Sequence, residues 1–188
     1  MKKVILLSLA VMLSYAVFGQ VEDNVPSKEQ KELTKAEKKE LRNLENEKRA
    51  ELTKEMVKSR QFVLEADYIG NQTGNRIPVN STINFVEVDT THIVIQLGSM
   101  TGIGYNGVGG ITTEGQISSF KTTENKKGDA YTMRIITNTL LGNYDIVIFV
   151  NSYGNASATI SGTTYGKLNY YGRIVPVQTS RIYKGRSL

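Results

Sequence analysis

MVKSRQFVLEA, residues 56–66, is the stretch that decides the fold, because one kind of polypeptide ends within it and another begins. Residues 28–60 carry 19 charges in 33 positions, whereas residues 61–188 carry 18 charges in 128 positions. The second part also holds nearly all the glycines and all but one of the tyrosines. The boundary at Arg60 and Gln61 therefore separates a solvated, charged segment from one with the composition of a β-domain. The contrast indicates how the chain is built and says little about its chemistry.

Residues 28–60 are predicted to form a long charged α-helix. Ser27-Lys28-Glu29-Gln30 fits a capping box, and the segment then runs to Ser59 without Gly or Pro. Its large apolar residues fall on one thin stripe, which is far from a sustained heptad repeat: Leu33, Leu41, Leu44, Leu52 and Met56. This pattern favours a solvated spacer whose last turns dock on the following domain. A helix that dimerises or binds a partner, and a disordered linker, remain as alternatives.

Beyond the boundary the hydrophobic period changes to two, which is typical of β-strands. Short apolar runs recur between turn signals, at residues 62–66, 83–88, 93–97, 117–120, 131–136, 144–150, 156–160 and 168–171. Short spacings without a helical period predict antiparallel neighbours. We therefore expect a mainly β domain, an antiparallel sandwich or open barrel of about eight strands. The run 144–150 is apolar on both faces, so we expect that strand to be central and covered on both sides.

The N-terminus has the features of an export signal. Met1-Lys2-Lys3 is followed by an uncharged apolar run to Phe18, and Val17-Phe18-Gly19 fits a signal-peptidase site, so we expect cleavage between Gly19 and Gln20. The run is too short for a comfortable membrane span, and no stop-transfer segment follows. The chain has no cysteine that could carry a lipid anchor. We expect an exported protein, periplasmic or secreted, with no permanent membrane anchor after cleavage.

These features divide the chain into a signal peptide (1–19), a flexible start (20–27), a charged helical segment (28–60), a β-domain (61–178) and a C-terminal tail (179–188). Cleavage would lower the formal charge from +5 to +3 by removing Lys2 and Lys3. The remaining positive excess is thin and interleaved with acids, which together with export argues against a nucleic-acid partner. The lack of cysteine also excludes disulfides and thiolate metal sites.

A glycine-rich segment, residues 98–110, contains the string Gly102-Ile103-Gly104-Tyr105-Asn106-Gly107, which satisfies G-x-G-x-x-G. A dinucleotide site needs that string between a strand and a helix, whereas the residues that follow here are β-like. We interpret the segment as an irregular loop whose glycines permit positive φ. Alternatively the loop borders a ligand pocket, and on that hypothesis the rim would be formed by Met100, Ile103, Tyr105 and Tyr171. The C-terminal tyrosines are expected mainly to pack across strands, with a glycan- or peptide-stacking platform as the alternative.

The sequence offers few residues that could catalyse a reaction. His92 is the single histidine, and its place at a strand start is typical of a surface or edge residue. Paired carboxylates could serve a hydrolase, since Glu65, Asp67, Glu87, Asp89, Glu114 and Asp145 could converge in space. Each of them is predicted on a strand or turn, where a solvated carboxylate is the default. We therefore expect no catalytic residues, no metal site and no cofactor.

Several motifs are shared with a known family. They are the opening strand Phe62-Val63-Leu64-Glu65-Ala66, the strands 83–91 and 93–98 before the glycines, and an ending built from Tyr144 to Val150, Gly154 to Ile160 and Tyr170 to Pro176. In these residues the chain resembles the domain-of-unknown-function family 4251, exported proteins of Gram-negative bacteria. The resemblance covers roughly 60–176 and implies a β-rich exported domain, with no catalytic residues to carry over. Members often have a Leu-Pro stretch before the glycines, and Gln96-Leu97-Gly98-Ser99 lacks that proline.

Two function classes follow. The first is a non-enzymatic binding or interaction module whose partner is an apolar small molecule, a glycan or an envelope protein. The second is a cell-envelope structural or assembly factor that uses the 28–60 helix for self-association or for a partner. A cavity of a few hundred Å³ in the β-domain would favour ligand binding, and a filled core would favour the interaction role.

Overall fold

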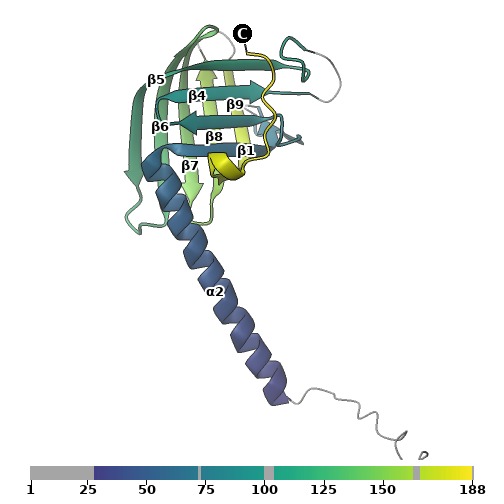
Figure 1. Cartoon of the computed structure of the whole chain (residues 1–188), viewed down its shortest axis with the longest axis vertical. Helices are drawn as coiled ribbons and strands as arrows, with labels where there is room; N and C mark the ends of the chain where they lie inside the picture. Colours follow the sequence, from purple (N-terminus) through teal and green to yellow (C-terminus); the bar gives the residue numbers. More distant parts are fainter. Residues whose placement is uncertain (1–27, 72, 100–103, 163–165, 188) are drawn as a thin grey trace, which may run out of the picture. The chain divides into compact units, whose positions relative to one another are not determined.

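The computed structural model describes residues 28–71, 73–99, 104–162 and 166–187, with side chains from Thr34 onward, so the expected signal peptide and flexible start lie outside the described residues. The elements, in chain order, are α2 (Lys28–Ser59), β1 (Gln61–Gly70), β2 (Arg76–Pro78), β3 (Phe85–Asp89), β4 (His92–Leu97), β5 (Ile111–Glu124), β6 (Ala130–Thr139), β7 (Gly142–Asn151), β8 (Asn155–Gly162), β9 (Gly166–Val175) and the 3-10 helix η1 (Val177–Thr179) (Figure 1). None of the described helices is long and apolar enough to cross a membrane. The chain divides into two compact units at Arg42 and Asn43, so the last turns of α2 belong to the same unit as the strands.

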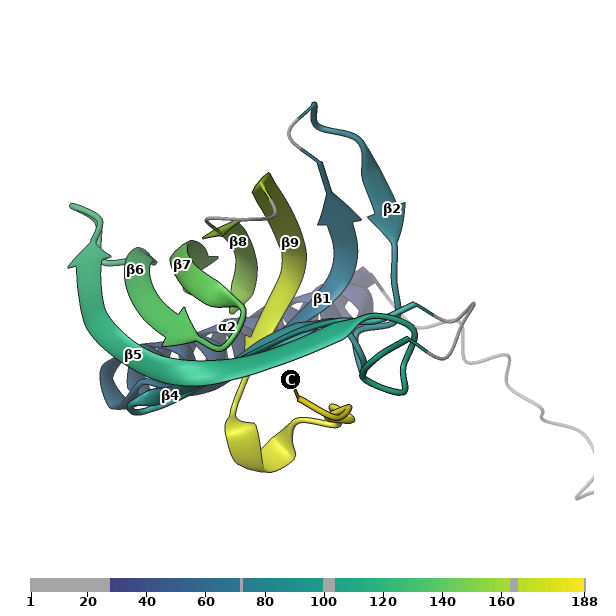
Figure 2. The ribbon, with the colours of Figure 1, turned by 90° about the horizontal axis from the view of Figure 1, so that it is seen from above.

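The strands form one antiparallel sheet that closes on itself. Their order is β2-β1-β3-β4-β5-β6-β7-β8-β9, and β1 pairs also with β9, where Leu64 lies opposite Ile174. Eight strands therefore close a barrel, while β2 pairs only with the end of β1 and lies outside the ring (Figure 2). The prediction of a mainly β antiparallel domain after a charged helix is confirmed. Of the two predicted alternatives the barrel is the one found, and it is closed because β1 has a partner on each side.

The barrel interior is filled by side chains over most of its length. Alternate residues of the strands point inward, as the two-residue period predicts. The buried cluster contains Phe62, Leu64, Ala66, Val86, Val88, Ile93, Ile95, Met133, Ile135, Ile146, Ile148, Val150, Ala158, Ile160 and Tyr170. The interior of an eight-stranded barrel is just wide enough for packed side chains or for one small ligand. Where side chains fill it, no room remains for a ligand.

The expectation that residues 144–150 are covered on both faces is wrong. Strand β7 is central, between β6 and β8, and Ile146, Ile148 and Val150 are fully buried inside the barrel. Val147 and Phe149, which point outward, are 38% and 49% exposed. A closed barrel has a single buried side at this strand, and an apolar outward residue there simply meets solvent.

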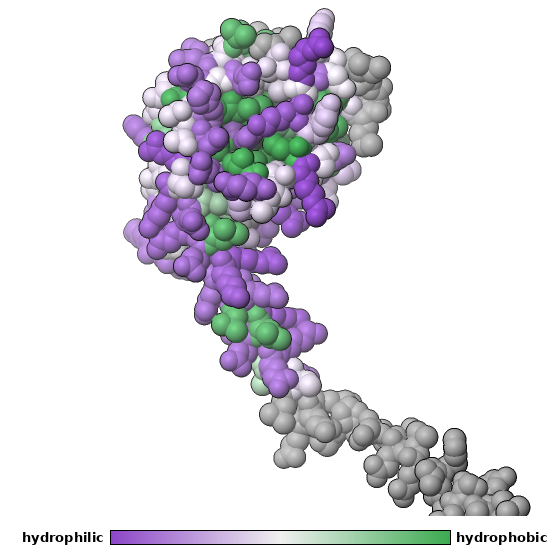
Figure 3. Space-filling view, viewed as in Figure 1, coloured by the Kyte–Doolittle hydropathy of each residue, from purple (hydrophilic) through white to green (hydrophobic). Residues whose placement is uncertain are grey.

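The last turns of α2 close one end of the barrel. Met56 and Val57 are each 4% exposed and belong to the buried cluster, whereas the other apolar residues of the predicted stripe that the structure describes are exposed: Leu41, Leu44 and Leu52. The surface of the helix is largely hydrophilic, with isolated apolar patches (Figure 3). Docking by the last turns agrees with the spacer interpretation of this segment.

Arg60 ends the helix at the predicted boundary. Its φ of 57° lies in the left-handed region, a common way for a helix to stop, although glycine is the usual residue there. The Arg60 carbonyl accepts a hydrogen bond from Thr90 N at 2.8 Å, and its guanidinium carbon lies 4.8 Å from the centre of the Phe120 ring. These contacts hold a backbone conformation that an arginine would otherwise rarely adopt.

The segment after β9, residues 176–187, crosses the outer face of the barrel (Figures 1 and 2); it includes the described part of the predicted tail and is called the tail from here on. Gln96 points outward from β4 and is fully buried beneath this tail. Its amide nitrogen donates to the Tyr183 carbonyl at 2.9 Å, and its amide oxygen accepts from Gly185 N at 2.7 Å. The two Gln96 groups thus hold the tail by its backbone.

Carboxylates on neighbouring strands hold the same tail. Ser180 Oγ donates to Glu65 Oε1 at 2.7 Å, and Lys184 Nζ lies 2.6 Å from Glu87 Oε2. Glu87 is only 5% exposed. The tail therefore satisfies polar groups on β1, β3 and β4 that would be costly to bury without a partner.

The described part of the glycine-rich loop is held by Asn106, which is 2% exposed. Its side-chain oxygen accepts from Val108 N and Gly110 N, and its amide nitrogen donates to Thr112 Oγ1 at 3.0 Å. A Cβ on Gly110 would lie 2.0 Å from the Leu97 carbonyl oxygen, so only glycine fits there. The element that follows is β5 rather than a helix, in agreement with the interpretation as an irregular loop.

Candidate binding site

A cavity of about 310 Å³ lies at the end of the barrel opposite α2, which we call the mouth. Its walls come from β4, β5, β7, β8 and β9 and are mainly aliphatic and aromatic: Ile95, Leu97, Ile111, Tyr144, Ile160 and Leu168. The volume is at the lower end of the range for small-molecule sites. The mouth of a β-barrel is also one of the places where such sites occur.

Thr113 places one hydroxyl in this apolar cavity. It points inward from β5, opposite Ile95 of β4, and is 3% exposed. Thr113 Oγ1 is buried and has no hydrogen-bond partner among the described residues. A buried hydroxyl without a partner costs about 1–3 kcal/mol, so this group is suited to a partner that arrives from outside the chain.

Tyr170 forms part of the floor and is already satisfied. The residue is fully buried, and its hydroxyl donates to the Gln96 carbonyl at 2.8 Å. Burial raises the pKa of the Tyr170 phenol well above its ordinary value, so the ring stays neutral. It therefore offers the cavity an uncharged surface.

Two glycines line the mouth between β8 and β9. Gly162 and Gly166 pair with each other and both line the cavity. A Cβ on Gly162 would lie 2.8 Å from Cε1 of Tyr144, so a larger residue would force that ring to move. The lack of a side chain at Gly162 makes room for the Tyr144 ring, which also lines the cavity.

The cavity carries almost no charge. Lys167 is the only charged residue among the described residues that line it, and it is exposed. A second, larger cavity of about 850 Å³ adjoins the first beside the β1–β2 hairpin, and Leu97 and Leu168 line both.

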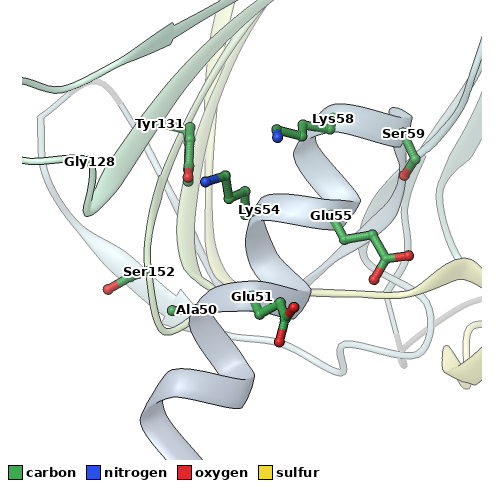
Figure 4. Close-up of a pocket in the computed structure, with 9 residues that line it drawn as sticks. All are labelled: Ala50, Glu51, Lys54, Glu55, Lys58, Ser59, Gly128, Tyr131 and Ser152. Carbon is green, nitrogen blue, oxygen red and sulfur yellow. The ribbon is translucent and has the colours of Figure 1, made fainter.

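A cleft of a different kind lies at the closed end, between the last turns of α2 and two turns of the barrel (Figure 4). It is broad, about 1020 Å³. Lys54 and Lys58 point toward Tyr131, whereas Glu51 and Glu55 point away from it (Figure 4). The pKa of Tyr131 is raised, first by burial and then by Glu124. The cleft is open and charged, so it offers no enclosed surface to an apolar ligand.

The sequence-predicted rim residues are not brought together at the mouth. Met100 and Ile103 lie outside the described residues. Tyr105 is 83% exposed and does not line the cavity. Tyr171 points to the outer face of β9, where the Arg76 guanidinium carbon lies 3.5 Å from the centre of its ring. A binding role for these residues stays a prediction, and the site described above uses others.

Sequence reasoning named as pocket rim none of the described residues that line this cavity, Thr113, Gly162 and Gly166 among them. Ile111 and Thr113 stand two apart at the start of β5, so a strict alternation does place both on one face. That the Thr113 hydroxyl finds no partner depends on the neighbouring strands, which the local sequence does not specify.

Four of the six carboxylates of the hydrolase hypothesis make the following contacts outside the cavity. Glu65 and Glu87 hold the tail, and Glu114 Oε1 accepts from Ser187 Oγ at 2.7 Å. Asp145 forms a two-point ion pair with Arg134 on the outer face, where this contact lowers the pKa of the Asp145 carboxyl. No group of three or more metal-ligating side chains gathers within the described part of the chain.

His92 lies on the surface, as predicted. It is exposed at the start of β4, and its Nδ1 is 3.2 Å from Thr91 Oγ1. Since β4 pairs with both β3 and β5, the residue lies on an inner strand of the sheet and not on an edge.

Comparison with known proteins agrees with this architecture. A sequence profile described as "Domain of unknown function (DUF4251)" matches residues 44–174. The crystal structure of a DUF4251 family protein from Bacteroides eggerthii is similar, with 29% sequence identity and a TM-score of 0.61, over 74% of this chain and 95% of that one. No curated protein matches the chain. The resemblance seen in the sequence motifs is thereby confirmed, and the chain belongs to the DUF4251 family.

Proposed function

We propose that this protein is an exported, non-enzymatic binding protein that holds a small apolar molecule in the mouth of its barrel. The observation that carries the proposal is the Thr113 hydroxyl, buried and without a partner in an otherwise apolar cavity of about 310 Å³. A ligand with an apolar body and one hydrogen-bond acceptor would accept a hydrogen bond from the Thr113 hydroxyl and would also cover the apolar walls of the cavity. The basic and apolar N-terminus supports export to the periplasm.

The test compares two probes on the purified chain that begins at Gln20. A 2-alkanone offers a carbonyl acceptor, and the alkane of equal length offers none. We expect the ketone to raise the melting temperature and the alkane to do so less. Thr113→Val should remove that difference because it keeps the shape and deletes the donor. Absence of binding by ketone and alkane alike would overturn the proposal.

A second candidate function rests on α2. Three leucines on this helix are exposed although they are large and apolar: Leu41, Leu44 and Leu52. They support the alternative of an envelope assembly factor whose helix binds a partner or a second copy. Deleting residues 20–50 keeps the docked residues Thr53, Met56 and Val57 and should lower the oligomeric mass measured by light scattering. An unchanged mass would count against self-association.

A further inference from the structure

The second cavity extends the mouth in one direction. Its lining comes from the β1–β2 hairpin and from the segments next to β3 and β4, and includes Ile69, Ile77, Pro78 and Val79. Ile77 is 62% exposed on β2, the strand outside the barrel ring. Of these residues Ile69 belongs to the buried core and Val79 packs against it, whereas Ile77 is not among the residues that fill the barrel.

The two cavities share a wall. Leu97 at the end of β4 and Leu168 near the start of β9 line both of them. Leu97 is 36% exposed and Leu168 is partly buried, so neither side chain is fully packed. An apolar chain that starts in the mouth can therefore continue past these leucines into the second cavity, whose lining is mainly apolar but includes Asn80, Asn84 and Ser99.

The charges that line the two cavities indicate which polar group a ligand can place beside Thr113. Among the described residues, none that lines the second cavity is charged, and the mouth has only the exposed Lys167. A carboxylate buried beside Thr113 would have one hydroxyl donor and no buried cation, since Lys167 is exposed, and this does not offset the loss of its hydration. A carbonyl, ester or hydroxyl oxygen needs only the single hydrogen bond that Thr113 can donate.

We infer that the two cavities together hold one uncharged, elongated lipid-like molecule. Its acceptor oxygen lies on the Thr113 hydroxyl, and its chain passes Leu97 and Leu168 to end beside Ile77. The inference rests on the proposed function and deepens it, since it assigns the ligand class, its direction and the role of β2.

In the experiment, 2-alkanones of increasing length are titrated into the purified protein that begins at Gln20, and isothermal titration calorimetry measures their affinity. Affinity should rise about threefold to fourfold for each added methylene, and should go on rising after the mouth is full. The fatty acid of equal length should bind at least tenfold more weakly at neutral pH. A plateau at short chains overturns the elongated ligand while leaving the proposed function intact; no binding at any length overturns both.

A matched pair of variants locates the chain. Ile77→Lys should weaken the longest ketone about tenfold or more and leave the shortest unchanged, because only the long chain reaches β2. Val147→Lys is the control, since Val147 is also an exposed apolar residue but lies on the outer face of β7. A ketone with a photoreactive group at its far end should label residues 69–84. Equal loss for both ketones in Ile77→Lys, or labelling confined to β7 and β8, overturns the assigned direction.

Discussion

The two ends of the barrel differ in what fills the interior. At the closed end Met56 and Val57 of α2 enter the interior and are almost fully buried. At the mouth the described lining residues all belong to the barrel strands themselves, and the Tyr144 ring lies against Gly162. The wall is the same eight strands at both ends. The two ends therefore differ in that a helix adds two side chains to the core at one end, while the other end keeps a cavity.

The largest expected effect concerns the closed end. Met56→Ala should lower the free energy of unfolding by about 2–5 kcal/mol, because it removes buried contacts and leaves a cavity. Leu52→Ala on the same helix is the control, since Leu52 is 42% exposed and its loss should stay within about 0.5 kcal/mol. Urea denaturation measures both. Equal effects would mean that α2 does not act as a plug.

The next test fills the mouth instead. Gly162→Val should abolish ketone binding and lower stability by about 1–3 kcal/mol, because its Cβ would displace the Tyr144 ring into the cavity. Gly74→Val is the matched control at a turn: nothing lies within 4 Å of its added Cβ, although its φ of 88° makes the substitution strained. That control should lose stability and keep ketone affinity. Retained binding by Gly162→Val would contradict the mouth as the site.

Two adjacent threonines are expected to have opposite effects on stability when each is replaced by valine. Thr112 and Thr113 are both buried, but Thr112 Oγ1 donates to Gln96 and accepts from Asn106 whereas Thr113 Oγ1 has no partner among the described residues. Thr112→Val should therefore destabilise by about 1 kcal/mol, and Thr113→Val should stabilise by a similar amount. Two denaturation curves without ligand settle the comparison. Destabilisation by both would show that Thr113 has a partner in the free protein.

The smallest effect is expected on the wall between the two ends. Arg134 donates to Asp145 and lowers the pKa of that carboxyl. The contribution of this ion pair to the free energy of unfolding is fully present above the unfolded pKa of Asp, near 4. It is lost as the pH falls through the lower pKa that Asp145 has in the folded protein. Arg134→Gln should thus slightly lower the urea midpoint at pH 7 and have no effect at low pH. The pair is exposed, so a large shift at pH 7 would be unexpected.

The fold was largely predictable because its signals are local. A two-residue hydrophobic period and turn residues indicate antiparallel strands wherever they occur, and the loss of charge after Arg60 marks where they start. Closure of the barrel is a different matter, since it depends on β1 pairing with β9 across about a hundred residues of chain. The same limit explains the error at β7: Val147 and Phe149 are apolar, but only the curvature of the whole sheet decides which face is inside.

The candidate site was much less predictable. Tyr105 and Tyr171 were singled out for residue type, and the structure places one on the surface and the other beneath Arg76. Thr113 was not singled out, because an unpaired hydroxyl is a property of its surroundings and not of its own sequence. Composition indicated the kind of domain; the position of the cavity follows from three-dimensional neighbours.

The C-terminal tail has one more consequence. It lies beyond the residues that the family profile matches, 44–174, yet it supplies partners to Gln96 and Glu87 on the barrel itself. In thermodynamic terms it is an intramolecular ligand whose covalent tether sets a high effective concentration at the outer face. Each of its contacts can then be weak while the segment as a whole stays bound. A chain cut at residue 174 would leave Gln96 and Glu87 without the partners that the tail supplies.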